Sequence, residues 1–69
     1  MIQIKNLRQQ RKLHQIKVAR DLGIPMSTMS RWEQGHHEPS IANILKLADY
    51  FDVSTDELLG RYEEHERDD

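Results

Sequence analysis

The chain has 69 residues, of which 36% are hydrophobic and 32% charged; its formal net charge is −2 and it contains no cysteine. This length allows one small domain, and the missing cysteine excludes disulfide bonds, cysteine-based zinc sites and cysteine nucleophiles. No apolar run approaches the roughly 18 residues that a membrane span requires, and the N-terminus lacks the apolar core of a signal peptide. We therefore expect a cytoplasmic protein with no membrane partner.

The charge is divided unevenly along the chain. Residues 1–35 carry seven basic and two acidic side chains, a balance of +5, whereas residues 36–69 carry three basic and ten acidic side chains, a balance of −7. This separation predicts a basic half that contacts an anionic partner and an acidic half that faces elsewhere. Two ordinary solvated surfaces would give the same counts, so the pattern alone leaves both interpretations open.

Apolar residues recur at helical spacing in five short segments, and no segment alternates as a strand would. The first spans roughly residues 3–12, with Ile4, Leu7 and Arg11 on one stripe. The second spans residues 15–22 and ends at Gly23, which can adopt the left-handed conformation of a helix C-cap.

The third segment begins near Pro25, whose fixed φ suits a first helical position, and runs to about Gln34. Ser40 is the expected N-cap of the fourth, whose stripe should face the core: Ile41, Ile44, Leu45, Ala48 and Phe51. In the fifth, Ser54 and Glu57 have the spacing of a capping box, and Gly60 ends it. We expect one domain over residues 1–60 and an acidic tail over residues 61–69.

Residues 15–35 are the most informative stretch. Two helices are joined by a tight turn that starts at Gly23, and Ala19 is small where the helices would cross. The apolar set is Val18, Ala19, Leu22, Ile24, Met29 and Trp32. This arrangement is typical of a helix-turn-helix, whose second helix lies in the DNA major groove.

A helical wheel at about 100° per residue separates the two sides of that second helix. Met29 and Trp32 define the inward side, and the opposite side carries Ser27, Ser30, Arg31 and Gln34. Arg31 is the strongest base-reading candidate, because a guanidinium can pair with guanine O6 and N7, which contributes roughly 1–3 kcal/mol of discrimination. Ser27 and Ser30 can hydrogen-bond bases or phosphates, and Met26 offers apolar contact.

Several short motifs occur together, and they are Leu13-x-Gln15-x-x-x-Ala19, Gly23, Ser27-Thr28-Met29-Ser30-x-Trp32-Glu33-x-Gly35, Pro39-Ser40 and Asp56-Glu57-Leu58-Leu59-Gly60. In this combination the chain resembles the Cro/C1-type (XRE) helix-turn-helix domains of phage repressors and small bacterial regulators, over residues 4–60. The resemblance implies an all-α, five-helix, lambda-repressor-like DNA-binding fold in which the second and third helices form the helix-turn-helix.

The resemblance also implies roles for individual residues. Met26, Ser27 and Arg31 match base-reading positions, Gln15 and Thr28 match phosphate-contacting positions, and Arg8 and Glu33 match a buried salt bridge. From the wheel we add Ser30 to the base-contacting set. We expect further phosphate contacts from Arg11, Lys17, Gln34, His36 and His37. His14 replaces the family's usual Ser or Thr N-cap, which weakens the start of the second helix.

So small a domain has little use for many large apolar groups near its C-terminal end unless they are buried. We expect Leu58, Leu59 and Tyr62 to contribute to a two-fold dimer, and the resemblance also implies a dimer contact in this region. A dimer would place two recognition helices roughly 34 Å apart on a palindrome. The predicted function is a homodimeric, sequence-specific double-stranded DNA-binding transcription regulator, in the first instance a repressor that excludes polymerase.

Two other functions remain open at this stage. The acidic C-terminal end suits an antitoxin that binds a basic toxin and represses its own operon. The net negative charge suits a protein-interaction or anti-repressor module without DNA binding. An enzyme is not expected, because no serine has a base at a recognisable spacing and no Gly-rich phosphate loop exists. The adjacent His36, His37 and Glu38 have no further ligand at a recognised spacing, so we expect neither metal nor cofactor.

Overall fold

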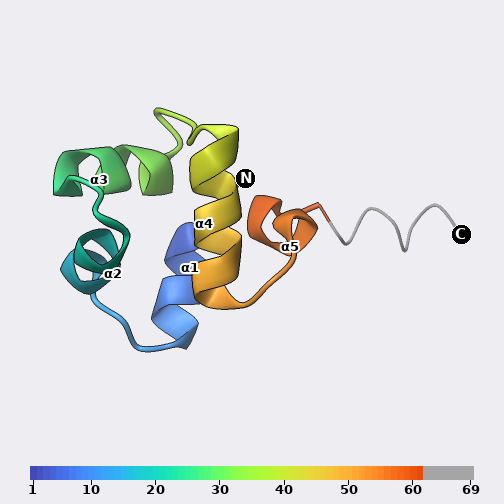
Figure 1. Cartoon of the computed structure of the whole chain (residues 1–69), viewed down its shortest axis with the longest axis horizontal. Coiled ribbons are helices and arrows are strands. Elements are labelled where there is room, and N and C mark those ends of the chain that lie inside the picture. The colour runs from blue at the N-terminus through green and yellow to red at the C-terminus, as the bar shows by residue number, and fades with distance from the viewer. Residues whose placement is uncertain (62–69) are drawn as a thin grey trace, which may run out of the picture.

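In the computed structural model, residues 1–61 are described, and this part of the chain forms five α-helices and no strand (Figure 1). The helices are α1 (Ile4–Gln10), α2 (Gln15–Leu22), α3 (Met26–Gln34), α4 (Ile41–Phe51) and α5 (Thr55–Leu59). The predicted all-α, five-helix architecture is therefore confirmed. Contacts between helices join α2 to α3, α4 to α5, and α1 to both α3 and α4. As a result, the α2–α3 pair and α5 lie at opposite ends of the described molecule.

Local chemistry sets most helix boundaries as predicted. Ser40 accepts a hydrogen bond from the Asn43 amide, and Ser54 with Glu57 forms a complete capping box. Each bond satisfies an amide that the first helical turn would otherwise leave unpaired. Gly23 ends α2 with a φ of 69°, the left-handed conformation that a residue without a Cβ adopts without steric cost.

The bounds of α1 and α3 differ from the predictions by one or two residues. Pro25 has a ψ of 145° and is the N-cap of α3, so the first helical residue is Met26. The predicted helix over 3–12 is shorter because Lys12 has a φ of 58°, which no helix can contain. His14 makes no side-chain capping bond to α2, as expected from an imidazole in place of a hydroxyl.

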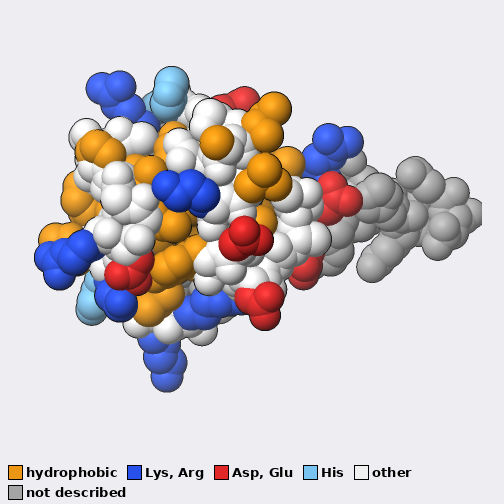
Figure 2. Space-filling model, in the orientation of Figure 1, with side chains coloured by type: hydrophobic (Ala, Val, Ile, Leu, Met, Phe, Trp, Pro, Cys, Tyr) orange, Lys and Arg blue, Asp and Glu red, His pale blue; other side chains and the backbone are white. Residues whose placement is uncertain are grey.

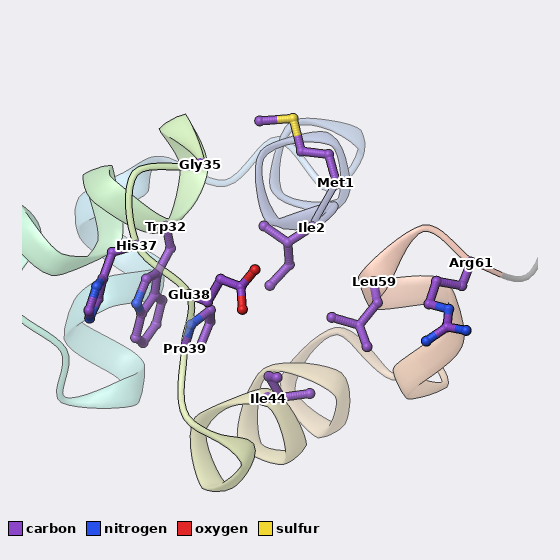
Figure 3. A pocket seen from close by; sticks show the side chains of 10 residues that line it. All are labelled: Met1, Ile2, Trp32, Gly35, His37, Glu38, Pro39, Ile44, Leu59 and Arg61. Atoms are coloured by element: carbon purple, nitrogen blue, oxygen red, sulfur yellow. The ribbon is translucent and has the colours of Figure 1, made fainter.

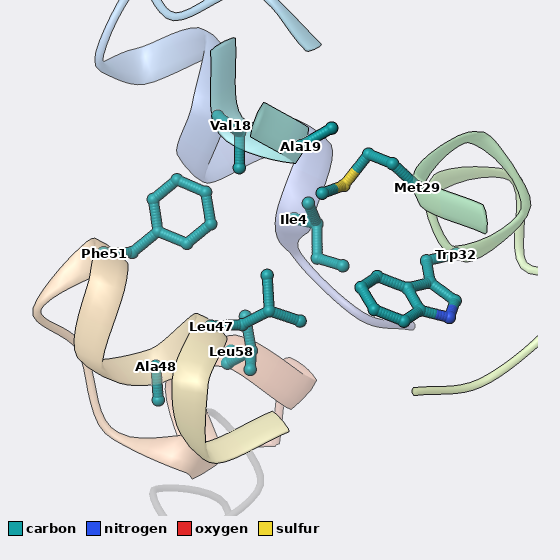
Figure 4. Close-up of a cluster of buried hydrophobic side chains, with 9 residues drawn as sticks. All are labelled: Ile4, Val18, Ala19, Met29, Trp32, Leu47, Ala48, Phe51 and Leu58. Atoms are coloured by element: carbon teal, nitrogen blue, oxygen red, sulfur yellow. The ribbon is translucent and has the colours of Figure 1, made fainter. Parts of the chain in front are cut away.

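The core draws side chains from all five helices (Figure 4). Trp32 and Phe51 are its largest members, and both are buried almost completely. The buried apolar set is Ile4, Val18, Ala19, Met29, Trp32, Leu47, Ala48, Phe51 and Leu58. Since this core includes residues of α2 and α3 as well as α1, α4 and α5, the helix-turn-helix is held by the rest of the domain.

The predicted core stripe of α4 is partly wrong. Ile41 is 77% exposed and Leu45 is 53% exposed, whereas Leu47, which the stripe omitted, is buried. Apolar residues cover a wide arc of this helix, so spacing alone does not say which part of the arc faces inward. The neighbours of α4 decide it, and α4 therefore keeps an exposed apolar flank formed by Ile41 and Leu45.

Within residues 1–61, no helix combines the length and the apolar character that crossing a bilayer would require.

Candidate nucleic-acid interface

The turn between α2 and α3 is fixed by backbone geometry. The Ile24 amide donates a 2.8 Å hydrogen bond to the Ala19 carbonyl, which folds the chain back immediately after Gly23. Val18 and Ala19 of α2 and Met29 of α3 are buried between the helices and the rest of the core. The two helices thus have the arrangement that the sequence predicted for a helix-turn-helix.

The outward side of α3 is available to a partner. Ser27, Arg31 and Gln34 are exposed, and Met26 in the first turn is 40% exposed. Within residues 1–61, the Arg31 guanidinium makes no hydrogen bond or ion pair, so all its donors remain free for another molecule. Trp32 lies on the opposite side, almost completely buried.

Thr28 and Ser30 are half-buried rather than exposed. The Ser30 hydroxyl lies 3.1 Å from Oε1 of Gln15, to which it donates a hydrogen bond, so this serine is occupied by α2. The wheel placed Ser30 with Ser27 and Arg31 on one outward side. It could not indicate which flank of α3 would meet α2, because that depends on the crossing of the two helices.

Behind α3, Arg8 and Glu33 form the ion pair that the family resemblance implied. The Arg8 Nε and Nη2 atoms donate to the two Glu33 carboxylate oxygens at 2.8 and 3.0 Å, and Nη1 donates to the Leu13 carbonyl at 2.9 Å. The hydrogen bonds to Glu33 raise the pKa of Arg8, although partial burial opposes this shift. Gln15 adds a third donor to the carboxylate, with Nε2 at 3.2 Å from Oε1 of Glu33.

The other residues predicted to contact phosphates have varied surroundings. Lys17 is exposed and pairs with Asp21 at 2.9 Å, four residues along α2. Arg11 donates to the Phe51 carbonyl at 2.7 Å and lies 5.5 Å from the centre of the Phe51 ring, so it is tied to α4. Gln34, His36 and His37 are exposed at and beyond the C-terminal end of α3.

Among residues 1–61, the basic and acidic side chains are partly separated in space. Figure 2 shows Lys and Arg side chains around the end of the molecule formed by α2 and α3, while most Asp and Glu side chains on this face lie toward α4 and α5. A positive field over the exposed side of α3 would attract an anionic polymer and leave the acidic end facing away.

A contact that sequence reasoning missed links α2 to α4. The Tyr50 hydroxyl donates a 2.6 Å hydrogen bond to Oδ2 of Asp21, the same oxygen that pairs with Lys17. This bond raises the pKa of Tyr50 from 10.0 to about 12, and together with Lys17 it lowers the pKa of Asp21. The two residues are 29 positions apart, and no local pattern signals such a pair.

The residues expected at a dimer interface are placed differently from one another. Leu58 is fully buried in the core, so its assignment to a dimer interface is wrong: no part of its side chain is left for a second molecule. Leu59 is half-buried, and Tyr62 lies outside the described residues. The large apolar side chains of α4 that are exposed are Ile41 and Leu45, which the sequence analysis had placed in the core.

A cavity of about 450 Å³ lies next to the C-terminal end of α3, and Trp32 forms part of its wall (Figure 3). Ile2, Trp32, Ile44 and Leu59 give it a mainly apolar wall, and the Glu38 side chain projects into it. Among residues 1–61, no group of three or more His, Cys, Asp or Glu side chains could hold a metal ion. This cavity is separate from the exposed side of α3.

Comparison with known proteins agrees with this geometry. A family model described as helix-turn-helix matches residues 4–58. The chain is 35% identical over 48 residues to the cryptic phage CTXphi transcriptional repressor RstR of Vibrio cholerae, covering 70% of this chain and 43% of that protein. It is 50% identical over 40 residues to the HTH-type transcriptional regulator AnsR of Bacillus subtilis, covering 58% of this chain and 34% of that protein.

A further relative is the HTH-type transcriptional regulator ImmR of Bacillus subtilis, 35% identical over 60 residues, which cover 87% of this chain and 47% of that protein. The chain spans less than half the length of each of these three relatives.

Proposed function

Because the chain belongs to the Cro/C1-type (XRE) helix-turn-helix family, we propose that it binds double-stranded DNA sequence-specifically and regulates transcription, as a homodimeric repressor on a palindromic operator. The observation that carries the proposal is the two-sided α3, with Met29 and Trp32 buried and Ser27, Arg31 and Gln34 exposed. In this proposal α3 enters the major groove and its exposed side faces the base edges.

Sequence choice rests on Arg31, Ser27 and Met26. Arg31 has a free guanidinium, which suits the bidentate recognition of guanine, and Met26 presents an exposed apolar group at the start of the helix. Phosphate contacts by Gln15, Thr28, Lys17, Gln34, His36 and His37 would set the position of the domain on the duplex. Arg11 belongs to this set only if it exchanges its bond to the Phe51 carbonyl for a phosphate.

The homodimer is supported by apolar surface that the described fold leaves uncovered. Ile41 and Leu45 lie one turn apart on α4 and both are more than half exposed, and Leu59 of α5 is half-buried. Burial of these side chains between two copies would stabilise a two-fold pair. Its oligomeric state can be measured by sedimentation velocity, with Leu45→Ser as the variant expected to shift it toward the monomer.

The deciding experiment is selection of bound duplexes from a random pool at low salt. We expect a palindromic sequence, and binding to it whose log affinity falls with log salt with a slope of about −0.9 per phosphate neutralised. The matched variants are Arg31→Ala and Arg61→Ala. Each removes one exposed arginine, the first from α3 and the second from the position that follows Gly60.

Failure of every duplex to bind at low salt would refute the proposal and favour a protein-interaction module. Co-purification with a small basic protein would instead favour the antitoxin.

A further inference from the structure

The side-chain amide of Gln15 is held at both ends by residues of α3. Its Oε1 accepts a hydrogen bond from the Ser30 hydroxyl at 3.1 Å, and its Nε2 donates to Oε1 of Glu33 at 3.2 Å. Gln15 is the first residue of α2 and is half-buried, so its side chain lies where the two helices approach each other. The contact therefore crosses the helix-turn-helix at its open side.

These two partners fix the direction of the amide. The Glu33 carboxylate forms two hydrogen bonds with Arg8, at 2.8 and 3.0 Å, as expected of an ionised group that only accepts. Glu33 must therefore face the NH₂ end of Gln15, because rotating the amide by half a turn would bring two oxygens together. A primary amide has two N–H groups, so one remains after Glu33 is satisfied.

We infer that Ser30 and Glu33 are positioning residues, which hold the second N–H of Gln15 ready to donate to a DNA phosphate oxygen. This inference rests on the proposed function. It gives Ser30 a different role from base reading, since the hydroxyl proton of Ser30 is already donated to Gln15. It also connects the Arg8–Glu33 ion pair to DNA binding through a single intervening side chain.

The benefit to binding is that Gln15 does not have to be immobilised when DNA arrives. Ordering a long side chain at an interface costs roughly 0.5–1.5 kcal/mol, and 1.4 kcal/mol corresponds to a factor of ten, so the preset amide is expected to raise affinity about two- to twelvefold. Because a phosphate is the same at every base pair, the gain is expected to be equal for all duplex sequences.

The first test compares Ser30→Ala with Ser30→Thr on the selected operator and on duplexes with single base-pair changes. Ser30→Ala is expected to weaken all of them by the same factor, about two- to twelvefold, and Ser30→Thr, which keeps a hydroxyl, is expected to restore most of the loss. In a Gln15→Ala background, Ser30→Ala is expected to have no further effect, because it acts through Gln15. A change in the ratio between duplexes, or additive losses from the two substitutions, would overturn the inference.

The second test needs no DNA. In the free protein, Ser30→Ala is expected to shift the two side-chain N–H resonances of Gln15 and bring them closer together, because the amide is held less firmly. Ser27→Ala, which changes a serine on the exposed side of α3, is expected to leave both resonances unchanged. If the duplexes bind but the Gln15 resonances do not respond to Ser30→Ala, this inference alone fails. If the resonances respond but no duplex is retained at low salt, the proposed function fails.

Discussion

Arg8 of α1 donates two hydrogen bonds, of 2.8 and 3.0 Å, to the carboxylate of Glu33 of α3. The two side chains are only 13% and 5% exposed. The pair joins the first helix of the chain to the helix proposed to read DNA. Since the Arg8 guanidinium also caps the Leu13 carbonyl at 2.9 Å, one side chain fixes α1, α3 and the entry to α2. The orientation of the helix-turn-helix thus depends on a residue outside it.

Removing the Glu33 carboxylate is expected to destabilise the domain strongly. Glu33→Ala leaves a largely buried guanidinium without its counter-charge, and we expect a loss of about 3 kcal/mol in the free energy of unfolding, measured by urea denaturation. The control is Lys17→Ala, which breaks an ion pair whose lysine is 57% exposed and should leave the unfolding midpoint unchanged. Equal effects of the two substitutions would contradict a structural role for the buried pair.

A double variant separates stability from positioning. Arg8→Met with Glu33→Leu replaces both charges by apolar groups, which is often neutral for stability. We expect it to regain most of the stability that Glu33→Ala loses while leaving the Gln15 amide without its acceptor.

Arg31→Ala is expected to reduce discrimination at one base pair of the operator. A bidentate arginine–guanine contact contributes roughly 1–3 kcal/mol, so the preference for guanine at that position should fall by about five- to a hundredfold, measured by competition between duplexes. Preferences at the other positions should persist, because Ser27 and Met26 are untouched. The control Arg61→Ala should weaken binding slightly and equally for all sequences. If Arg31→Ala keeps the preference for the operator unchanged, the assignment of Arg31 as a base-reading residue is refuted.

Truncation of Leu58 is expected to destabilise the domain strongly, whereas truncation of Leu45 is expected to change its stability little. Leu58→Ala creates a cavity in the core and should lower the free energy of unfolding by about 2–5 kcal/mol. Leu45→Ser changes a side chain that is 53% exposed and should alter the stability of the monomer by no more than about 0.5 kcal/mol. Thermal and urea unfolding at a concentration where the chain is monomeric would measure both. A large decrease in the free energy of unfolding for Leu45→Ser, without one for Leu58→Ala, would mean that α4 is rotated from the orientation described.

The Tyr50–Asp21 bond predicts a dependence of stability on alkaline pH. The pKa of Tyr50 is raised from 10.0 to about 12 in the folded chain. The Tyr50 hydroxyl therefore contributes fully to the free energy of unfolding below pH 10, and this contribution is lost as the pH rises to about 12. Asp21 has a lowered pKa, first through the Tyr50 hydrogen bond and then through Lys17, so its contribution is present above 3.8 and is lost as the pH falls below that value.

The measurement is a tyrosinate absorbance titration in a Tyr62→Phe background, where Tyr50 is the one remaining tyrosine. Asp21→Asn should return the Tyr50 pKa toward its ordinary value, because the negative charge that opposes ionisation is removed. Ionisation of Tyr50 near pH 10 in Tyr62→Phe with Asp21 in place would show that the Tyr50–Asp21 hydrogen bond is absent in solution.

Much of the fold followed from local patterns. Ser40 and Ser54 cap their helices as their spacing predicted, and Gly23 ends α2 in the left-handed conformation. These features depend on hydrogen bonds and steric limits within a few residues, so the sequence contains all that is needed to predict them. The inward position of Trp32 followed equally well, because few positions on α3 carry large apolar groups.

The tertiary structure decided questions of side and of neighbour. On the wheel of α3, Ser30 and Arg31 lie equally far from the inward direction, yet Ser30 bonds to Gln15 while Arg31 is free, because α2 crosses only one flank. On α4, helical spacing placed Leu45 in the core and omitted Leu47, but packing against the other helices buries Leu47 and leaves Leu45 exposed. Periodicity reports the angle of a residue around its own helix, but which angle meets another helix depends on contacts between distant segments.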